Sequence, residues 1–127
     1  MKLELKNEHR WDVAPYEAQR LQKELQSLVS EEDTTEPIRT IAGVELAHSR
    51  FSDTLIAAVS VLSFPDLTLI EEVSAEYQTT FPYIAGLLSF RECPAILKAL
   101  EQLKTLPDLL VIDGPGVAHP HGFGVAS

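Results

Sequence analysis

The sequence lacks the features of secreted and membrane-spanning proteins. It contains a single cysteine, Cys93, so no disulfide can form within the chain, and a reducing compartment is the natural setting. No apolar run approaches the ~20 residues that a membrane-spanning helix requires. The N-terminal residues 1–12 alternate in charge and contain no apolar core typical of a signal peptide. We therefore expect a cytoplasmic protein without a membrane segment.

Positive charge is also scarce. The chain has 10 Lys and Arg residues against 19 Asp and Glu residues, which gives a formal net charge of -9. Nucleic-acid-binding proteins usually carry a basic patch, so the overall charge argues against indiscriminate binding of nucleic acid. It does not exclude a local site in which metal ions neutralise carboxylates. A length of 127 residues, with 45% hydrophobic residues, predicts one globular domain.

The first half of the chain predicts a helix followed by an antiparallel sheet. Apolar residues at helical spacing indicate a helix over 14–29, and Pro15 suits its first turn. The polar, acidic stretch 30–37 is typical of a linker, and the remaining residues 38–127 would form the sheet and helix core. Apolar, partly alternating runs with short connections predict three antiparallel strands, at 39–47, 55–64 and 67–77.

The second half predicts a helix and a buried strand. Pro94 can occupy the first turn of a helix, and four apolar residues at helical spacing follow it. The run LLVI, 109–112, is short and wholly apolar, which favours a parallel strand in a central position. The expected fold class is therefore α/β, with three antiparallel strands, a helix and a parallel strand.

Three carboxylates stand where a simple core would not require them. Glu45 interrupts an apolar strand, Glu92 lies at the start of the predicted helix, and Asp113 ends the buried strand. Ligand sites in open α/β sheets form at strand ends. Three acids that converged there would offer oxygen ligands suited to Mg²⁺ or Mn²⁺. Purely structural roles for these acids also stay open, because a helix dipole favours an acid such as Glu92 and Asp113-Gly114 could be a turn.

Other candidates have equally ordinary alternatives. His119 and His121 form a His-x-His pair that could ligate metal, although histidines in a loop are more often exposed. Tyr83 could stack on an unpaired base or could anchor the core. Cys93 has no evident His–Asp arrangement and is expected to be a half-buried small residue.

Three longer motifs carry a resemblance to a known family. The stretches IAGVELA (41–47), TTFPYIAGLLSFRECPAIL (79–97) and PDLLVIDGPGVAHPHGFGVAS (107–127) resemble the N-terminal half of endonuclease V. This family contains deoxyinosine-directed nucleases of RNase H-like fold. The resemblance covers about residues 14 to 127 and implies metal-dependent hydrolysis of a phosphodiester bond 3′ to deaminated bases, in DNA or in RNA.

The resemblance also implies roles for individual residues. Metal ligands and catalytic residues would be Glu45, Glu92 and Asp113, with His119 as a further catalytic residue. A strand-separating wedge and the neighbouring contacts would hold the nucleic acid, which assigns nucleic-acid binding to Pro82, Tyr83, Ile84, Arg91, Gly114 and Gly116. The expected cofactor is Mg²⁺ or Mn²⁺.

The sequence departs from the family pattern at several positions. Glu45 stands in place of an Asp, Ala85 in place of the second wedge proline, Pro115 in place of a polar residue and His121 in place of an arginine. The family's second half is absent after Ser127, so we expect a C-terminally truncated domain. The strand at 109–112 would then be exposed, which favours self-association or a complementary partner chain. A catalytically impaired remnant or split subunit is therefore the alternative to an active nuclease.

Overall fold

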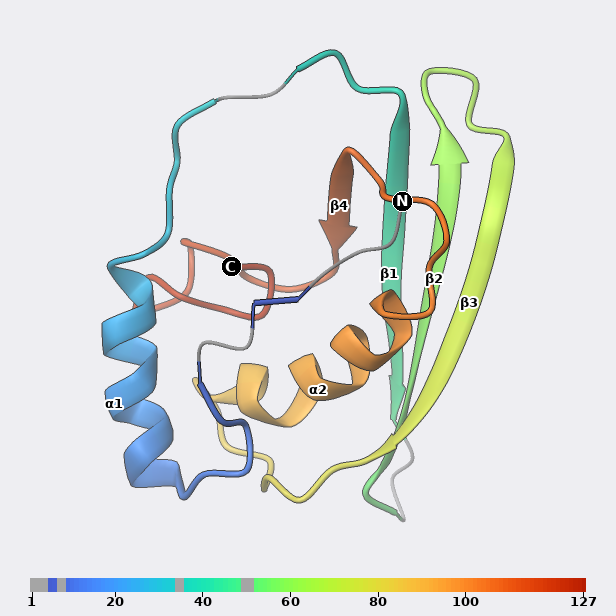
Figure 1. Cartoon of the computed structure of the whole chain (residues 1–127). Coiled ribbons are helices and arrows are strands. Elements are labelled where there is room, and N and C mark those ends of the chain that lie inside the picture. Colours follow the sequence, from blue (N-terminus) through green and yellow to red (C-terminus); the bar gives the residue numbers. More distant parts are fainter. Residues whose placement is uncertain (1–4, 7–8, 34–35, 49–51) are drawn as a thin grey trace.

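The chain forms one mixed sheet with two helices on the same side of it (Figure 1). The structure is a computed structural model that describes residues 5–6, 9–33, 36–48 and 52–127. Its elements are α1 (Pro15–Gln26), β1 (Thr40–His48), β2 (Thr54–Ser63), β3 (Leu69–Gln78), α2 (Leu88–Leu100) and β4 (Leu109–Ile112). The strand order is β3-β2-β1-β4, with β4 parallel to β1 and the other pairs antiparallel. The α/β prediction of three antiparallel strands, a helix and a parallel strand is confirmed.

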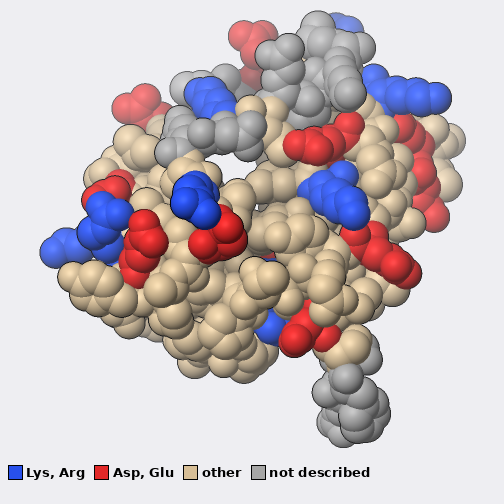
Figure 2. Space-filling view, turned by 60° about the horizontal axis from the view of Figure 1, so that its bottom comes forward, with Lys and Arg blue, Asp and Glu red and all other residues tan. Residues whose placement is uncertain are grey.

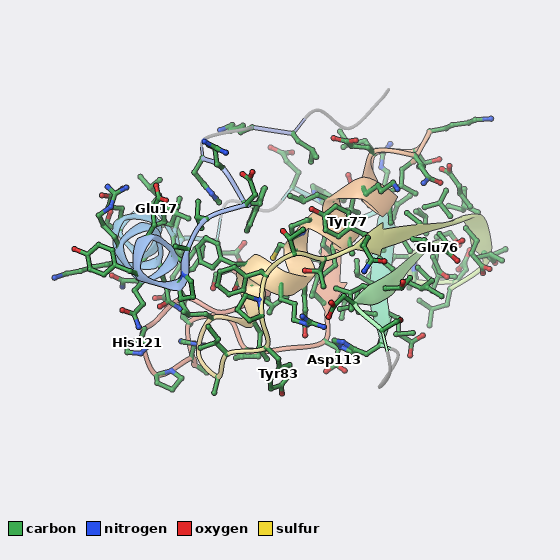
Figure 3. All side chains as sticks on the ribbon, turned by 90° about the horizontal axis from the view of Figure 1, so that it is seen from below. Glu17, Glu76, Tyr77, Tyr83, Asp113 and His121 are labelled. Atoms are coloured by element: carbon green, nitrogen blue, oxygen red, sulfur yellow. The ribbon has the colours of Figure 1, made fainter. Side chains whose placement is uncertain are left out.

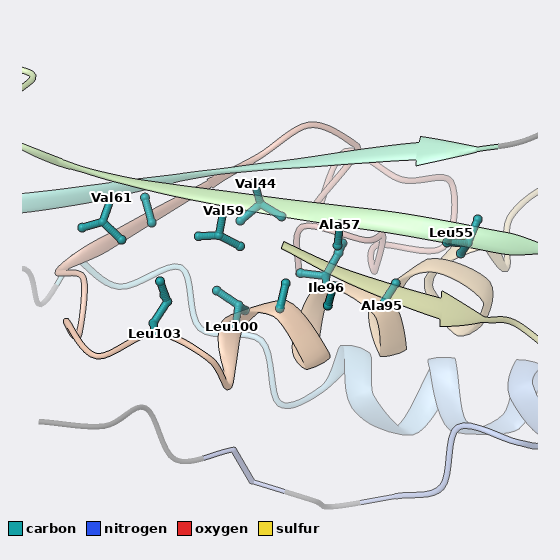
Figure 4. Close-up of a cluster of buried hydrophobic side chains, with 12 residues drawn as sticks. Val44, Leu55, Ala57, Val59, Val61, Ala95, Ile96, Leu100 and Leu103 are labelled. Carbon is teal, nitrogen blue, oxygen red and sulfur yellow. The ribbon is translucent and has the colours of Figure 1, made fainter. Parts of the chain in front are cut away.

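The main core lies between the sheet and α2. Alternate residues of β2 point toward α2 because side chains in a strand alternate between faces, and Leu55, Ala57, Val59 and Val61 are fully buried. Helix α2 covers them with a stripe of small and branched residues (Figure 4). That stripe consists of Ala95, Ile96, Ala99 and Leu100.

A second apolar cluster attaches α1 to the start of α2. Ala18 of α1 is fully buried and contacts Phe81, Leu87 and Phe90. The ring centroids of Phe81 and Phe90 lie 5.7 Å apart, a separation typical of packed aromatic pairs. The position of α1 therefore depends on the segment that joins β3 to α2.

Asp108 fixes the alignment of β4 on β1. Its carboxylate accepts hydrogen bonds from the backbone N–H groups of Arg39 (2.8 Å) and Thr40 (3.1 Å). These two bonds lower the pKa of Asp108 below its usual value. The backbone N–H of Asp108 in turn donates to the Thr40 carbonyl at 3.1 Å. The parallel register, in which Val44 faces Ile112, follows from this junction.

Two expectations about the second half were wrong. Helix α2 begins at Leu88, so Pro94 lies inside the helix and not in its first turn. Burial of Ser89 and Phe90 extends the helix on the N-terminal side of the proline, and this tertiary packing outweighs the local proline signal. Strand β4 is parallel as expected, but it occupies an edge of the sheet and not a central position.

The remaining boundaries differ by a few residues. Helix α1 ends at Gln26 instead of residue 29, and 30–33 continue without helix or strand. Strand β3 begins at Leu69 because Leu67 lies in the preceding turn with φ of 60°. No helix in the described ranges has the length and apolar character needed to cross a membrane.

Candidate functional site

The three predicted acids line one cavity at the β1–β4 side of the sheet. Glu45, Glu92 and Asp113 border a hollow of about 230 Å³ together with His48. Its wall also includes aliphatic side chains of the core, such as Ile96. The structure therefore brings together three residues that are 47 and 21 positions apart in the sequence.

The parallel pairing of β4 with β1 places two of these acids next to each other. Val44 and Ile112 are partners in the register, so the residues that follow them, Glu45 inside β1 and Asp113 just after β4, lie beside each other. Val44 is buried, and Glu45 therefore points to the opposite face, where it is exposed. Asp113 is also exposed.

Glu92 enters the cavity from α2 and is the most buried of the three acids. Its side chain is 15% exposed, and the first turn of α2 contains no acidic residue, so an interaction with the helix dipole does not explain its position. Burial raises the pKa of Glu92, and the nearby His48 and Arg91 partly oppose this shift. A carboxyl held in this way is favoured in its ionised form when a cation binds beside it.

Sequence reasoning missed His48. Its Nε2 lies 3.6 Å from Oε1 of Glu92, close enough for an ion pair when the imidazole is protonated. The available signal was weak: His48 ends the same strand that carries Glu45, while Glu92 is 44 residues away. The site therefore contains one imidazole besides the three carboxylates.

The donor set suits a hard divalent cation, but its side chains are spread. Among the described residues, no three His, Cys, Asp or Glu side chains are already arranged to hold a metal ion. Carboxylate oxygens are the ligands that Mg²⁺ and Mn²⁺ prefer. Glu45 and Asp113 are exposed, and both also border a second hollow that Glu92 does not reach, so the chemistry of the donors fits such a cation while their present positions do not enclose one.

The loop before α2 presents an aromatic ring to solvent. Tyr83 is 70% exposed, which excludes the alternative of a core anchor, and Pro82 beside it is exposed as well. Ile84 turns inward and contacts the second apolar cluster. In Figure 3, Tyr83 and Asp113 project from the same side of the molecule.

Arg91 holds this loop from inside the molecule. Its side chain is only 11% exposed, and Nη1 donates a hydrogen bond of 2.7 Å to the Phe81 carbonyl. Nη2 lies 3.4 Å from a carboxylate oxygen of Asp53. Arg91 therefore holds the loop by a hydrogen bond, and its positive charge favours the ionised form of the neighbouring Glu92.

The segment after β4 folds back on itself. Gly114 adopts a φ of 145°, which other residues rarely do. The Gly116 carbonyl accepts hydrogen bonds from the N–H groups of His119 and Gly124, both at 3.1 Å. His119 lines a different hollow from the three acids, and its Nδ1 accepts a hydrogen bond from the His121 N–H at 3.0 Å. The described structure therefore separates His119 from the carboxylate cavity.

Cys93 is unsuited to nucleophilic chemistry. Burial, reinforced by the negative charge of Glu92, raises the pKa of its thiol to about 12. A thiolate is the reactive form of cysteine, and it is therefore scarce here at neutral pH.

The charges of the visible surface are mixed. Figure 2 shows Lys and Arg side chains dispersed among Asp and Glu on one face, with a broad uncharged area in its lower part. Binding of a polyanion on this face would therefore depend on local contacts and on cations more than on a continuous basic surface.

Comparison with known proteins shows the family of the chain. The sequence profile of the endonuclease V family matches residues 23–127. The chain belongs to the endonuclease V family. It is 47% identical to the endonuclease V of Dehalococcoides mccartyi strain BAV1 over all 127 residues, which correspond to 57% of that relative's length. The chain thus spans little more than half the length of this family member.

Solved structures of the family have the same fold. The endonuclease V of Streptomyces avermitilis superimposes with a TM-score of 0.84 at 40% identity, covering 92% of this chain and 52% of that protein. The Ciona intestinalis endonuclease V, solved in complex with a 24mer DNA containing an inosine followed by a ribo-adenosine, superimposes with a TM-score of 0.79. That comparison covers 88% of this chain and 50% of the other at 23% identity, and it shows the shared fold.

Proposed function

We propose that this chain provides the metal-binding and lesion-contacting part of an endonuclease V that acts on nucleic acid containing deaminated bases such as deoxyinosine. The observation that carries the proposal is the convergence of Glu45, Glu92 and Asp113 on one cavity, on a molecule that also exposes Tyr83. The DNA complex of the Ciona relative supports DNA as the partner. The single cysteine favours the cytoplasm as the place of action.

The proposed reaction is hydrolysis of a phosphodiester bond 3′ to the deaminated base. Mg²⁺ or Mn²⁺, held by the three carboxylates, would supply activation of water and stabilisation of the leaving oxygen. Glu92, whose side chain is the most buried of the three, would hold the metal together with the exposed Glu45 and Asp113.

Tyr83 would act on the base stack. An aromatic ring that packs on an unstacked base contributes ~1–3 kcal/mol. This contribution would offset part of the few kcal/mol that base extrusion costs. Pro82 and Ile84 would support the ring from either side, one exposed and one packed inward.

A second candidate function is binding of a partner chain. Three consecutive apolar residues of the edge strand β4 are exposed: Leu109 by 40%, Leu110 by 39% and Val111 by 55%. An adjoining hollow of about 300 Å³ between β4, α2 and the final residues is lined mainly by apolar side chains. A polypeptide equivalent to the rest of a full-length relative would cover this edge, and the chain would then be one half of a split enzyme.

One assay separates the two functions. The purified chain is incubated with an inosine-containing oligonucleotide and Mn²⁺, with Glu92→Ala as the matched inactive control. Cleavage that the substitution abolishes supports an autonomous nuclease. Cleavage that appears only after addition of the remaining part of a relative, such as the Dehalococcoides enzyme, supports the split form. Absence of cleavage in both arms contradicts nuclease activity.

A further inference from the structure

The loop that carries Tyr83 is fixed at both ends by buried polar side chains. At its start, the Phe81 carbonyl accepts the 2.7 Å hydrogen bond from Arg91, and the Phe81 ring is 4% exposed. At its end, the Gly86 carbonyl accepts a 2.7 Å hydrogen bond from Nε2 of Gln22. The exposed ring of Tyr83 therefore lies between two anchored points.

Gln22 also holds a third segment. Its Nε2 lies 3.2 Å from the carbonyl oxygen of Phe123, a second acceptor that is 101 residues away in the sequence. A primary amide nitrogen carries two N–H groups, so it can donate to Gly86 and Phe123 at the same time. One side chain of α1 thus joins the Tyr83 loop to the segment that follows β4.

Packing alone does not account for a glutamine at this position. Gln22 is 5% exposed, and the fully buried Ala18 one turn earlier already seals α1 against the aromatic cluster. Burial of an amide costs free energy unless its hydrogen bonds are made, whereas an aliphatic residue of similar volume would incur no such cost. The two donated bonds are therefore the reason for the amide.

The geometry of Gly86 makes its anchor decisive. Gly86 has φ of 87°, in the left-handed region, and only the Leu87 N–H to Ile84 carbonyl bond of 3.0 Å closes the turn from within. A glycine backbone has more conformational freedom than the backbone of any other residue type. A bond from outside the loop is what selects one direction for the chain that leads back to Tyr83.

We propose that Gln22 is a positioning residue for Tyr83, acting through its side-chain amide on Gly86 and coupling the loop to the segment at Phe123. Its effect on nucleic-acid binding rests on the proposed function. The positioning itself does not, and it can be measured in the free protein.

The first test uses fluorine NMR on the tyrosines. The chain contains three, Tyr16, Tyr77 and Tyr83, so labelling with 3-fluorotyrosine gives three resonances, and Tyr83→Phe assigns the relevant one. Gln22→Met removes both donors and keeps the side-chain length. We expect it to shift or broaden the Tyr83 resonance and to leave that of Tyr77 in β3 unchanged.

Hydrogen exchange gives a second readout of the same variant. The amide protons of Leu87 and Gly124, on the two anchored segments, should exchange about 10-fold faster in Gln22→Met, as loss of one to two net hydrogen bonds implies. The matched control is Gln19→Met, on the exposed side of α1, which should leave both readouts unchanged. An unchanged Tyr83 resonance together with unchanged exchange in Gln22→Met would overturn the proposal.

Gln22→Glu separates hydrogen bonding from packing. A carboxylate cannot donate, whereas the protonated acid donates one bond. The Tyr83 resonance of this variant should therefore be displaced at neutral pH and return toward the wild-type position in acid. A Cβ atom built on Gly86 would lie 4.0 Å from a ring carbon of His119 and 4.0 Å from one of His121, and Arg91 holds the other end of the loop. Because these ionisable side chains are near the loop, wild type and Gln22→Met are titrated in parallel as controls. A response independent of pH contradicts the role of the amide.

Global unfolding and failure of DNA binding are distinguishable outcomes. Loss of the Tyr77 resonance in Gln22→Met would indicate that this variant does not fold. In that case Gln22→Asn, which retains the amide on a shorter side chain, should disturb the Tyr83 resonance alone. An undisturbed Tyr83 resonance in Gln22→Asn would refute the proposal. Fluorescence anisotropy with an inosine oligonucleotide should show about 5-fold weaker binding for Gln22→Met, and adding Gln22→Met to Tyr83→Ala should cause no further loss. Absence of binding by the wild type refutes the proposed function only.

Discussion

Strands β2 and β4 are both largely apolar but have different environments. In β2, Leu55 and Val59 are fully buried beneath α2, whereas in β4 Leu110 and Val111 are 39% and 55% exposed. Both runs are rich in Leu, Val and Ile, so composition alone would bury both. Composition alone therefore does not decide burial: α2 covers β2, whereas Leu109, Leu110 and Val111 of the edge strand β4 stay partly exposed.

The largest expected effect tests the buried side of this comparison. Leu55→Ala removes a fully buried side chain from the main core, and we expect the free energy of unfolding to fall by ~2–5 kcal/mol. Urea denaturation followed by circular dichroism measures the change. Leu110→Ala in β4 is the matched control, with a loss below ~1 kcal/mol, because its side chain is already partly in water. Equal losses of unfolding free energy in the two variants would contradict the difference in burial between β2 and β4.

A smaller loss is expected at the junction of β1 and β4. Asp108→Asn removes the charge that accepts the Arg39 and Thr40 N–H groups. Because the folded pKa of Asp108 is lowered, its contribution is present above the unfolded pKa and is lost as pH falls through the folded pKa. Thermal melting of wild type and variant should therefore differ at neutral pH and converge in strong acid. A difference that persists in acid would exclude this cause.

The exposed strand should control association more than stability. Val111→Lys places a charge at the open edge, and charged residues on an edge strand prevent pairing with another chain. We expect the variant to be monomeric in light-scattering chromatography and the wild type to associate as concentration rises. A wild type that is monomeric and does not bind a hydrophobic dye would show that the edge is inert.

The smallest expected effect concerns Glu92. Its folded pKa is raised by burial, so ionisation destabilises the metal-free protein as pH rises through that pKa. Glu92→Gln should therefore raise the melting temperature slightly at neutral pH, by ~2–4 °C. Added Mn²⁺ should stabilise the wild type and not the variant, as differential scanning fluorimetry would show. Equal stabilisation of both proteins by Mn²⁺ would remove Glu92 from the metal site.

Periodicity along the chain was enough to predict the strands of the sheet, whereas the roles of the site residues stay predictions. Apolar runs located β1 to β3, and 109–112 was expected to be parallel, but only the structure shows that it pairs with β1 and so lies beside Glu45. The start of α2 could not be predicted, because Pro94 gave a strong local signal and burial of Phe90 overrode it. A local sequence pattern depends only on neighbouring residues, whereas the start of α2 is set by packing against residues that are distant in the sequence.

The residues that sequence reasoning missed depend on distant partners. His48 faces Glu92 across 44 positions, and Gln22 donates to carbonyls 64 and 101 residues away. Backbone carbonyls carry no residue identity, so no motif could reveal the role of Gln22. The placement of His119 away from the acid cavity was equally inaccessible, since it follows from the fold of the final residues.

The late position of β4 also bears on the order of folding. Strands β1, β2 and β3 follow one another closely and can pair locally, whereas β4 joins β1 across 68 residues. Closing such a long loop costs more entropy than forming a hairpin, so we expect β4 to dock last during folding and to open first in the native state. Asp113 follows directly after β4. The acid cavity would therefore be completed only in the last step, and its integrity would report on whether the whole chain has folded.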